Sequence, residues 1–152
     1  MKIYSRLDAL LRASGISGRE AATREKASEL IAPFVDEITT DVMGNLIALR
    51  RARASGEEKG ASVMFCAHMD EIGFIVTFIE DSGYIRASAV GGIHATAAAY
   101  TNVVSNKGVA GLVAVSEDKK KGEVKIDDLY IDIGAKNKKE AEKLPFFLHC
   151  CL

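Results

Sequence analysis

Two side chains with metal-binding chemistry stand two residues apart, directly after an apolar run. The stretch is MFCAHMDEIGF, Met64 to Phe74, and the two residues are His68 and Asp70. Strand side chains alternate between faces, so this pair points the same way if a strand continues to Asp70. A metal-bound histidine usually gives its second ring N–H to a carboxylate, which fixes its tautomer. The spacing therefore predicts that His68 binds a metal, with Asp70 orienting it or ligating as well.

The same pair has a second interpretation, as a hydrogen-bonded surface pair without chemistry. From these residues alone the surface pair is the more frequent outcome, because a metal site needs about three or four protein ligands. His94 follows two glycines in an expected turn, and His149 lies in the last eight residues, so both are weak candidate ligands. Glu71 projects to the other side of the strand. The sequence contains no nucleophile elbow, phosphate loop, HExxH or CxxC motif.

The apolar run before the pair predicts the element that positions it. Residues 63–67 are apolar throughout, which is typical of a strand buried on both faces of an α/β sheet. Cys66 lies inside this run and is expected to be a small core residue. Sites in α/β sheets form at the carboxyl ends of strands, so the pair stands where such a site is expected.

Helices and a strand pair are predicted before this run. Apolar residues at helical spacing predict a helix over residues 3–13. Ser17 and Glu20 have the spacing of a capping box, so a second helix is expected to begin there, turn its apolar side to a core, and end at Pro33. Two strands follow with a turn at Gly44 and Asn45, over residues 35–40 and 45–49.

The sequence changes character after Gly73. Five short segments rich in β-branched residues are separated by glycine-containing or charged turns, which is the pattern of an all-β domain. A domain boundary is therefore expected near residue 72. A short helix is expected over residues 137–144, capped by Asn137 with Glu140 three residues on. The last eight residues, PFFLHCCL, are interpreted either as a buried strand or as a divergent, frameshifted end.

The composition is that of an ordinary globular protein. The 152 residues are 48% hydrophobic and 27% charged, with a net charge of -1, so nothing in the charge indicates a nucleic-acid partner. No apolar run reaches the roughly 18 residues of a membrane span, and the N-terminus lacks the apolar stretch of a signal peptide. The three cysteines do not form a disulfide framework. A cytoplasmic location without membrane or nucleic-acid partners is the expectation.

Five stretches match, in order, the motifs of a known family and reach Leu144. They are SGISGRE (14–20), TTDVMGNLIA (39–48), AHMDEIGFIV (67–76), GYIRASAVGGI (83–93) and LYIDIGAKNKKEAEKL (129–144). AHMDEIGF is quite specific. On these motifs the chain resembles the glutamyl or deblocking aminopeptidases, dinuclear metallopeptidases that include the tetrahedral aminopeptidases. Some members of that family carry an older label of endoglucanase or cellulase M.

The resemblance implies an α/β fold: the first part of an aminopeptidase-type α/β catalytic domain, followed by an inserted, incomplete β-barrel-like dimerisation domain. Residues 1–71 would belong to the catalytic domain and residues 72–144 to the barrel, with residues 145–152 as a divergent apolar tail. His68 matches a histidine that binds one of two zinc or cobalt ions. Asp70 matches the aspartate that orients this histidine, which makes Asp70 the candidate catalytic residue.

Two hypotheses follow, because family members are more than twice as long and carry their other ligands and catalytic glutamates after the barrel. The first is a metal-dependent aminopeptidase that removes N-terminal residues from peptides, truncated before most ligands and so expected to be inactive as an isolated chain. The second is a non-catalytic fragment that forms homo-oligomers through exposed strand edges. Glycosidase activity is not expected, since Asp70 and Glu71, as strand neighbours, would point apart and form no carboxylate pair.

Overall fold

The computed structural model describes residues 3–52, 61–116, 124–143 and 148–149. The chain divides into two compact units, Met1–Asp70 and Glu71–Leu152, called the N-terminal unit and the C-terminal unit below. The expected fold class is confirmed: helices and strands of an α/β type come first and a β-barrel-like domain follows. Within the described residues, no helix combines the length and the apolar character that a membrane crossing requires.

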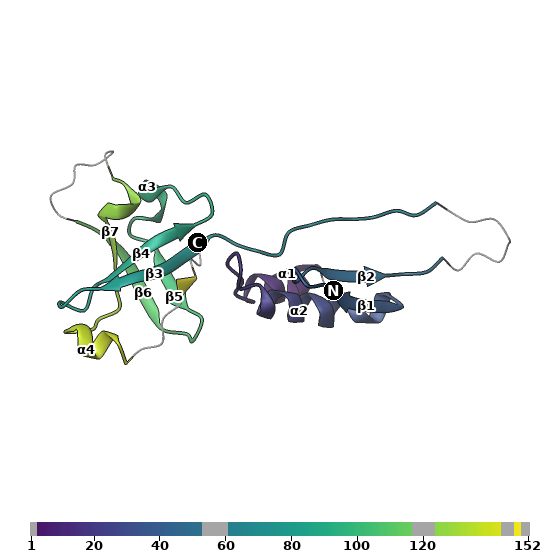
Figure 1. Ribbon diagram of the computed structural model, residues 1–152, viewed down its shortest axis with the longest axis horizontal. Coiled ribbons are helices and arrows are strands. Elements are labelled where there is room, and N and C mark those ends of the chain that lie inside the picture. Colours follow the sequence, from purple (N-terminus) through teal and green to yellow (C-terminus); the bar gives the residue numbers. More distant parts are fainter. Residues whose placement is uncertain (1–2, 53–60, 117–123, 144–147, 150–152) are drawn as a thin grey trace. The chain divides into compact units, whose positions relative to one another are not determined.

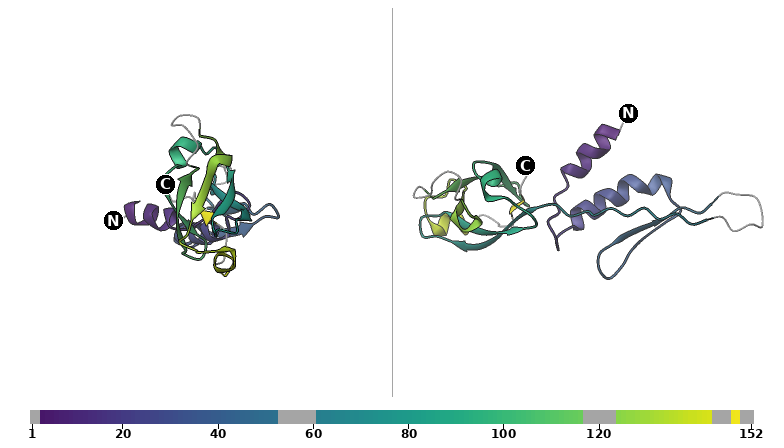
Figure 2. Two further views of the ribbon diagram at one scale, coloured as in Figure 1. Left: turned by 90° about the vertical axis from the view of Figure 1, so that its left-hand side faces the viewer. Right: turned by 90° about the horizontal axis from the view of Figure 1, so that it is seen from above.

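The N-terminal unit holds two helices and a two-stranded hairpin (Figure 1). Its helices are α1 (Ile3–Leu11) and α2 (Ala21–Ile31), and a 3-10 turn at Ala32–Phe34, which contains Pro33, follows α2. Strand β1 (Glu37–Thr40) pairs antiparallel with β2 (Leu46–Leu49). Helix α2 contacts β2, and Figure 2 shows α2 beside the hairpin while α1 diverges from it.

The apolar sides of these helices are not buried, contrary to the expectation. Neither helix contains a buried residue, and the side chains of Leu11 and Phe34 remain 70% and 46% exposed. Two helices and a two-stranded hairpin cannot enclose a sizeable core, which takes three or more strands or a second packed layer. The N-terminal unit therefore presents much of its apolar surface to solvent.

The expected buried strand over residues 63–67 is also wrong. These residues form no strand, and Val63, Met64 and Phe65 are 74%, 84% and 93% exposed. Cys66 is exposed as well and is not a core residue. A strand is stable only where its backbone N–H and C=O groups find a neighbouring strand. No described strand of the N-terminal unit pairs with this segment, so its apolar side chains stay in water.

The C-terminal unit is an antiparallel barrel in the strand order β3-β4-β7-β6-β5-β8 (Figure 1). The strands are β3 (Gly73–Ile79), β4 (Ile85–Val90), β5 (Asn102–Ser105), β6 (Ala110–Val115), β7 (Leu129–Asp132) and β8 (Leu148–His149). The β-rich segments expected after Gly73 are thus confirmed. Strand β8 closes the sheet by pairing with both β3 and β5. It lies in the stretch 145–152, whose other residues are outside the described part of the chain.

One apolar cluster fills this barrel. It gathers the inward-facing residues of five strands and two alanines of the short helix α3 (Ala95–Ala98): Phe74, Ile85, Ala95, Ala98, Val103, Val113, Leu129 and Ile131. Helix α4 (Lys138–Ala141) lies at the opposite end of the barrel from α3 (Figure 1). It begins at the expected cap, where the side-chain oxygen of Asn137 accepts a hydrogen bond from the Glu140 N–H at 3.0 Å.

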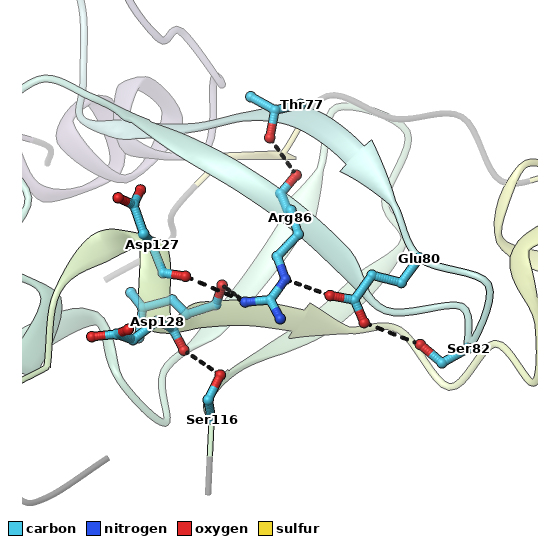
Figure 3. Close-up of polar contacts among 8 residues, drawn as sticks. Thr77, Glu80, Ser82, Arg86, Ser116, Asp127 and Asp128 are labelled. Atoms are coloured by element: carbon cyan, nitrogen blue, oxygen red, sulfur yellow. Dashed lines mark hydrogen bonds and ion pairs between the residues drawn. The ribbon is translucent and has the colours of Figure 1, made fainter. Parts of the chain in front are cut away.

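Arg86 on β4 joins the β3–β4 hairpin to the start of β7 (Figure 3). Its Nε donates to Glu80 Oε1 at 2.5 Å, and its Nη1 donates to the carbonyl oxygens of Leu129 and Asp127 at 3.2 and 3.4 Å. The hydroxyl of Thr77 donates to the Arg86 carbonyl oxygen at 3.1 Å. This one side chain therefore ties together backbone that is far apart in the sequence.

Candidate metal centre

His68 and Asp70 contact each other although no strand carries them. His68 Nδ1 lies 3.0 Å from Asp70 Oδ1 and 2.9 Å from the Asp70 carbonyl oxygen. Both oxygens only accept hydrogen bonds when the carboxylate is ionised, so Nδ1 carries the proton. In the neutral ring Nε2 then keeps its lone pair, on a side chain that is 85% exposed. A metal-binding histidine with its orienting carboxylate has this arrangement.

The second carboxylate oxygen of Asp70 has a partner from a distant part of the chain. The Ser17 hydroxyl donates to Asp70 Oδ2 at 2.5 Å. This hydrogen bond lowers the pKa of Asp70 below its ordinary value; partial desolvation opposes the shift, and the contact with His68 adds to it. Asp70 is therefore ionised at neutral pH and accepts hydrogen bonds at both oxygens.

The capping role that the sequence predicts for Ser17 is wrong. Helix α2 begins at Ala21, and Glu20 before it makes no side-chain capping hydrogen bond. Glu20 Oε1 instead accepts from the Gly18 N–H at 2.6 Å. A serine hydroxyl can hydrogen-bond either to the backbone at the start of a helix or to a distant carboxylate. The local sequence is the same in both cases. Ser17 was therefore missed as a neighbour of the candidate site.

The other candidate ligands belong to the C-terminal unit. His94 is exposed at the N-cap of α3 and makes no side-chain capping hydrogen bond, and His149 lies in β8. Asp127 and Asp128 lie in a 3-10 turn, and Asp132 ends β7. Among the residues that the structure describes, no group of three or more His, Cys, Asp or Glu side chains is placed to hold a metal ion.

The donor chemistry of His68 and Asp70 fits one part of a zinc or cobalt site. A neutral imidazole nitrogen is a good ligand for both ions, and a carboxylate on its other nitrogen makes it a better one. A protein site takes about three or four such ligands, and this pair supplies one nitrogen. The described residues therefore do not complete the coordination of an ion, and further ligands would have to come from outside them.

Comparison with known proteins places this pair in a family context. A family model described as M42 glutamyl aminopeptidase matches residues 44–146. A protein of Acetivibrio thermocellus that carries an aminopeptidase name is 42% identical over 133 residues, which cover 86% of this chain and 38% of that protein.

Solved structures give the same result. An aminopeptidase from the archaeon Desulfurococcus kamchatkensis matches with a TM-score of 0.82 at 29% identity, covering 95% of this chain and 40% of its own. The TET1 peptidase of Pyrococcus horikoshii matches with a TM-score of 0.76 at 36% identity, covering 97% of this chain and 45% of its own. It is described as assembling into a tetrahedron or a large octahedral shell. A Thermotoga maritima structure titled endoglucanase matches with a TM-score of 0.72 at 31% identity, covering 93% of this chain and 43% of its own.

These matches extend along most of the chain but not along most of its relatives. The chain spans between 38% and 45% of the length of these proteins. The endoglucanase title agrees with the older label expected for part of the family. The family expected from the sequence motifs is confirmed. The chain belongs to the M42 glutamyl aminopeptidase family.

Proposed function

We propose that this chain forms part of a metal-dependent aminopeptidase that removes N-terminal residues from peptides. The observation that carries the proposal is the contact of His68 Nδ1 with Asp70, which leaves Nε2 as a nitrogen that can ligate. Family membership supports peptidase chemistry, and the aminopeptidase names of the relatives support attack at the N-terminal residue. In this proposal residues 1–71 belong to the catalytic domain and residues 72–144 to a barrel used in association.

His68 and Asp70 have separate roles in the proposed site. His68 supplies a neutral nitrogen ligand through Nε2, and Asp70 fixes the tautomer and orientation of the ring and makes the ligand more basic. The proposed cofactor is a pair of zinc or cobalt ions, which when bound would polarise the scissile carbonyl and lower the pKa of a water molecule. The further ligands and the general base are assigned to the part of the longer relatives that this chain does not span, so residues 1–152 alone are not expected to turn over peptides.

Metal binding to this chain tests the proposal with a matched histidine control. The chain would be titrated with zinc or cobalt in a calorimeter, and retained metal would be measured by elemental analysis after loosely bound ions are removed. His68→Ala should reduce the zinc or cobalt that the chain retains. His94→Ala changes an exposed histidine of the C-terminal unit and should leave the retained metal unchanged. Metal binding that does not depend on His68 would refute the assignment of the ligand.

Turnover by a whole protein that contains residues 1–152 tests the reaction. His68→Ala should abolish hydrolysis of an aminoacyl chromogenic amide, and His94→Ala should retain it. A His68→Ala enzyme with wild-type turnover would contradict a role for this histidine in an aminopeptidase site.

A homo-oligomeric role for the barrel is the second candidate function. The observation that favours it is a set of exposed apolar side chains on the barrel strands: Ile75, Phe78 and Leu112 are 41%, 56% and 42% exposed. Ile75 and Phe78 lie on one strand, β3, and contiguous exposed apolar surface is typical of protein contacts. The Pyrococcus horikoshii relative is described as an assembly. We therefore propose another copy of the same protein as the partner.

Sedimentation velocity at micromolar concentration tests this association. Phe78→Ser should shift the protein toward the monomer. Tyr4→Ser is the control, because it removes an aromatic ring that is 87% exposed on α1 of the N-terminal unit. A wild-type protein that sediments as a monomer throughout would refute the oligomeric role.

A further inference from the structure

The turn that carries Ser17 has a defined backbone shape. The Arg19 N–H donates to the Ile16 carbonyl oxygen at 2.8 Å, which closes a four-residue turn around Ser17 and Gly18. Gly18 has φ of 81°, the conformation that a turn of this kind requires of its third residue and that favours glycine. Ile16, the first residue of the turn, is buried, with only 2% of its surface exposed. The Ser17 side chain therefore projects from a fixed frame.

The hydroxyl of Ser17 makes a tertiary contact. Its distance of 2.5 Å to Asp70 Oδ2 is that of a charge-assisted O–H···O⁻ hydrogen bond. The two residues are 53 positions apart, so neither the turn nor α2 needs this bond for its own geometry. The contact instead joins the turn to the segment that carries His68.

Through Asp70, the position of Ser17 affects His68. A carboxylate can rotate about its bond to the β-carbon, and a hydrogen bond that holds one oxygen also sets the direction of the other. With Oδ2 held by Ser17, Oδ1 lies 3.0 Å from His68 Nδ1. This contact adds to the one with the Asp70 carbonyl oxygen at 2.9 Å, and together they keep the proton on Nδ1, although a free imidazole side chain in water prefers the proton on Nε2.

We propose that Ser17 is a positioning residue of the His68 site: its hydroxyl fixes the Asp70 carboxylate and thereby the orientation and the Nδ1–H tautomer of His68. The effect on the tautomer stands on the hydrogen bonds alone. Its consequence for metal binding rests on the proposed function. The site then consists of three residues, one of which comes from the turn before α2.

Nitrogen NMR of the histidine rings measures the tautomer directly. The spectra would be recorded at about pH 8.5, well above the reference pKa of a histidine side chain, and the His68 signals are those that disappear in His68→Gln. The wild-type chain should hold His68 mainly as Nδ1–H, and Ser17→Ala should shift it toward Nε2–H. Ser17→Thr keeps a hydroxyl and should keep the wild-type tautomer. Ser88→Ala, which removes an exposed serine hydroxyl of β4, is the control and should change nothing.

Zinc affinity, measured on a whole protein that contains residues 1–152, gives a second readout. Loss of a residue that orients a metal ligand typically weakens binding by about 10- to 100-fold. Ser17 acts one hydrogen bond further away, so we expect a loss of about 3- to 10-fold for Ser17→Ala and little change for Ser17→Thr.

The possible results separate this proposal from the proposed function. An unchanged His68 tautomer in folded Ser17→Ala overturns the proposal, and so does a Ser17→Thr chain that loses the wild-type tautomer, because the hydroxyl would then not be the cause. If Ser17→Ala does not fold, Ser17→Cys, which keeps the size of the side chain but donates weakly, is judged by the same two results. A tautomer shift without His68-dependent zinc binding by a whole protein that contains residues 1–152 supports the role of Ser17 and refutes the proposed function. Zinc binding that needs His68, without a tautomer shift in Ser17→Ala, supports the proposed function and refutes the role of Ser17.

Discussion

Arg86→Met should make the barrel easier to unfold. The substitution removes the guanidinium, with its hydrogen bonds to Glu80 and to the carbonyl oxygens of Leu129 and Asp127. It keeps an aliphatic side chain of similar length beside the ring of Tyr130, over which the guanidinium lies at 5.8 Å. The change therefore tests the polar contacts more than the packing.

The expected loss can be worked out from these contacts. The Arg86 and Glu80 side chains are 34% and 28% exposed, and an ion pair in such a position contributes about 0.5 to 1 kcal/mol. Each hydrogen bond to a backbone carbonyl contributes about 0.5 to 1 kcal/mol. The free energy of unfolding should thus fall by about 2 kcal/mol, which lowers the melting temperature of a domain of this size by about 10 °C.

Urea unfolding followed by circular dichroism, with hydrogen exchange of the barrel amides, measures this loss. Lys139→Met is the matched control, because it removes one positive charge at the exposed end of α4. Glu80→Gln, alone and combined with Arg86→Met, completes a double-mutant cycle whose coupling should be about 0.5 to 1 kcal/mol. A loss for Arg86→Met no larger than that for Lys139→Met would refute the reasoning.

Substitutions at three further positions test other parts of the structure. Tyr100 holds φ of 65° with its side chain 72% exposed, so Tyr100→Gly should melt higher than Tyr100→Ala by the equivalent of about 1 kcal/mol; equal melting temperatures would contradict this strain. The side chain of Asn45, with backbone N–H groups, holds the pKa of Asp41 below its ordinary value. The resulting stabilisation of the hairpin is complete above the unfolded pKa of about 3.9 and is lost as the pH falls through the lower folded pKa, and Asp41→Asn should remove this pH dependence from urea unfolding curves. Ser105 is buried and its hydroxyl accepts from the Val109 N–H at 2.9 Å, so Ser105→Ala should lower the free energy of unfolding by about 1 to 2 kcal/mol; a loss within error of zero would argue against this hydrogen bond.

The barrel was predictable because its strands find their partners within the same unit. Phe74, Ile85 and Val113 alternate with outward-facing neighbours and are buried against each other. Residues 63–67 carry an equally strong apolar signal and form no strand. An apolar pattern indicates that a segment would be buried if a sheet were present, but the sheet itself must be supplied by other strands.

Only part of the candidate site could be predicted from the sequence. His68 and Asp70 are two residues apart, and they contact each other although the strand from which the sequence predicted this is absent. Ser17 reaches Asp70 from 53 residues away, through a turn that depends on the conformation of Gly18 and the burial of Ile16. No local pattern contains a contact of that kind.

The closing strand β8 sets the order in which the barrel can fold. Strands β3 to β7 pair in the order β3-β4-β7-β6-β5 without it, and β8 then joins β3 and β5 through two residue pairs on each side. The pairing of Gly73 with His149 spans nearly the whole C-terminal unit, so its loop-closure cost is the largest of the barrel and its formation comes late. Until then β3 and β5 are open edges. A second chain that arrives in this interval can insert its own β8, so slow closure turns a folding step into a concentration-dependent route to strand exchange between copies.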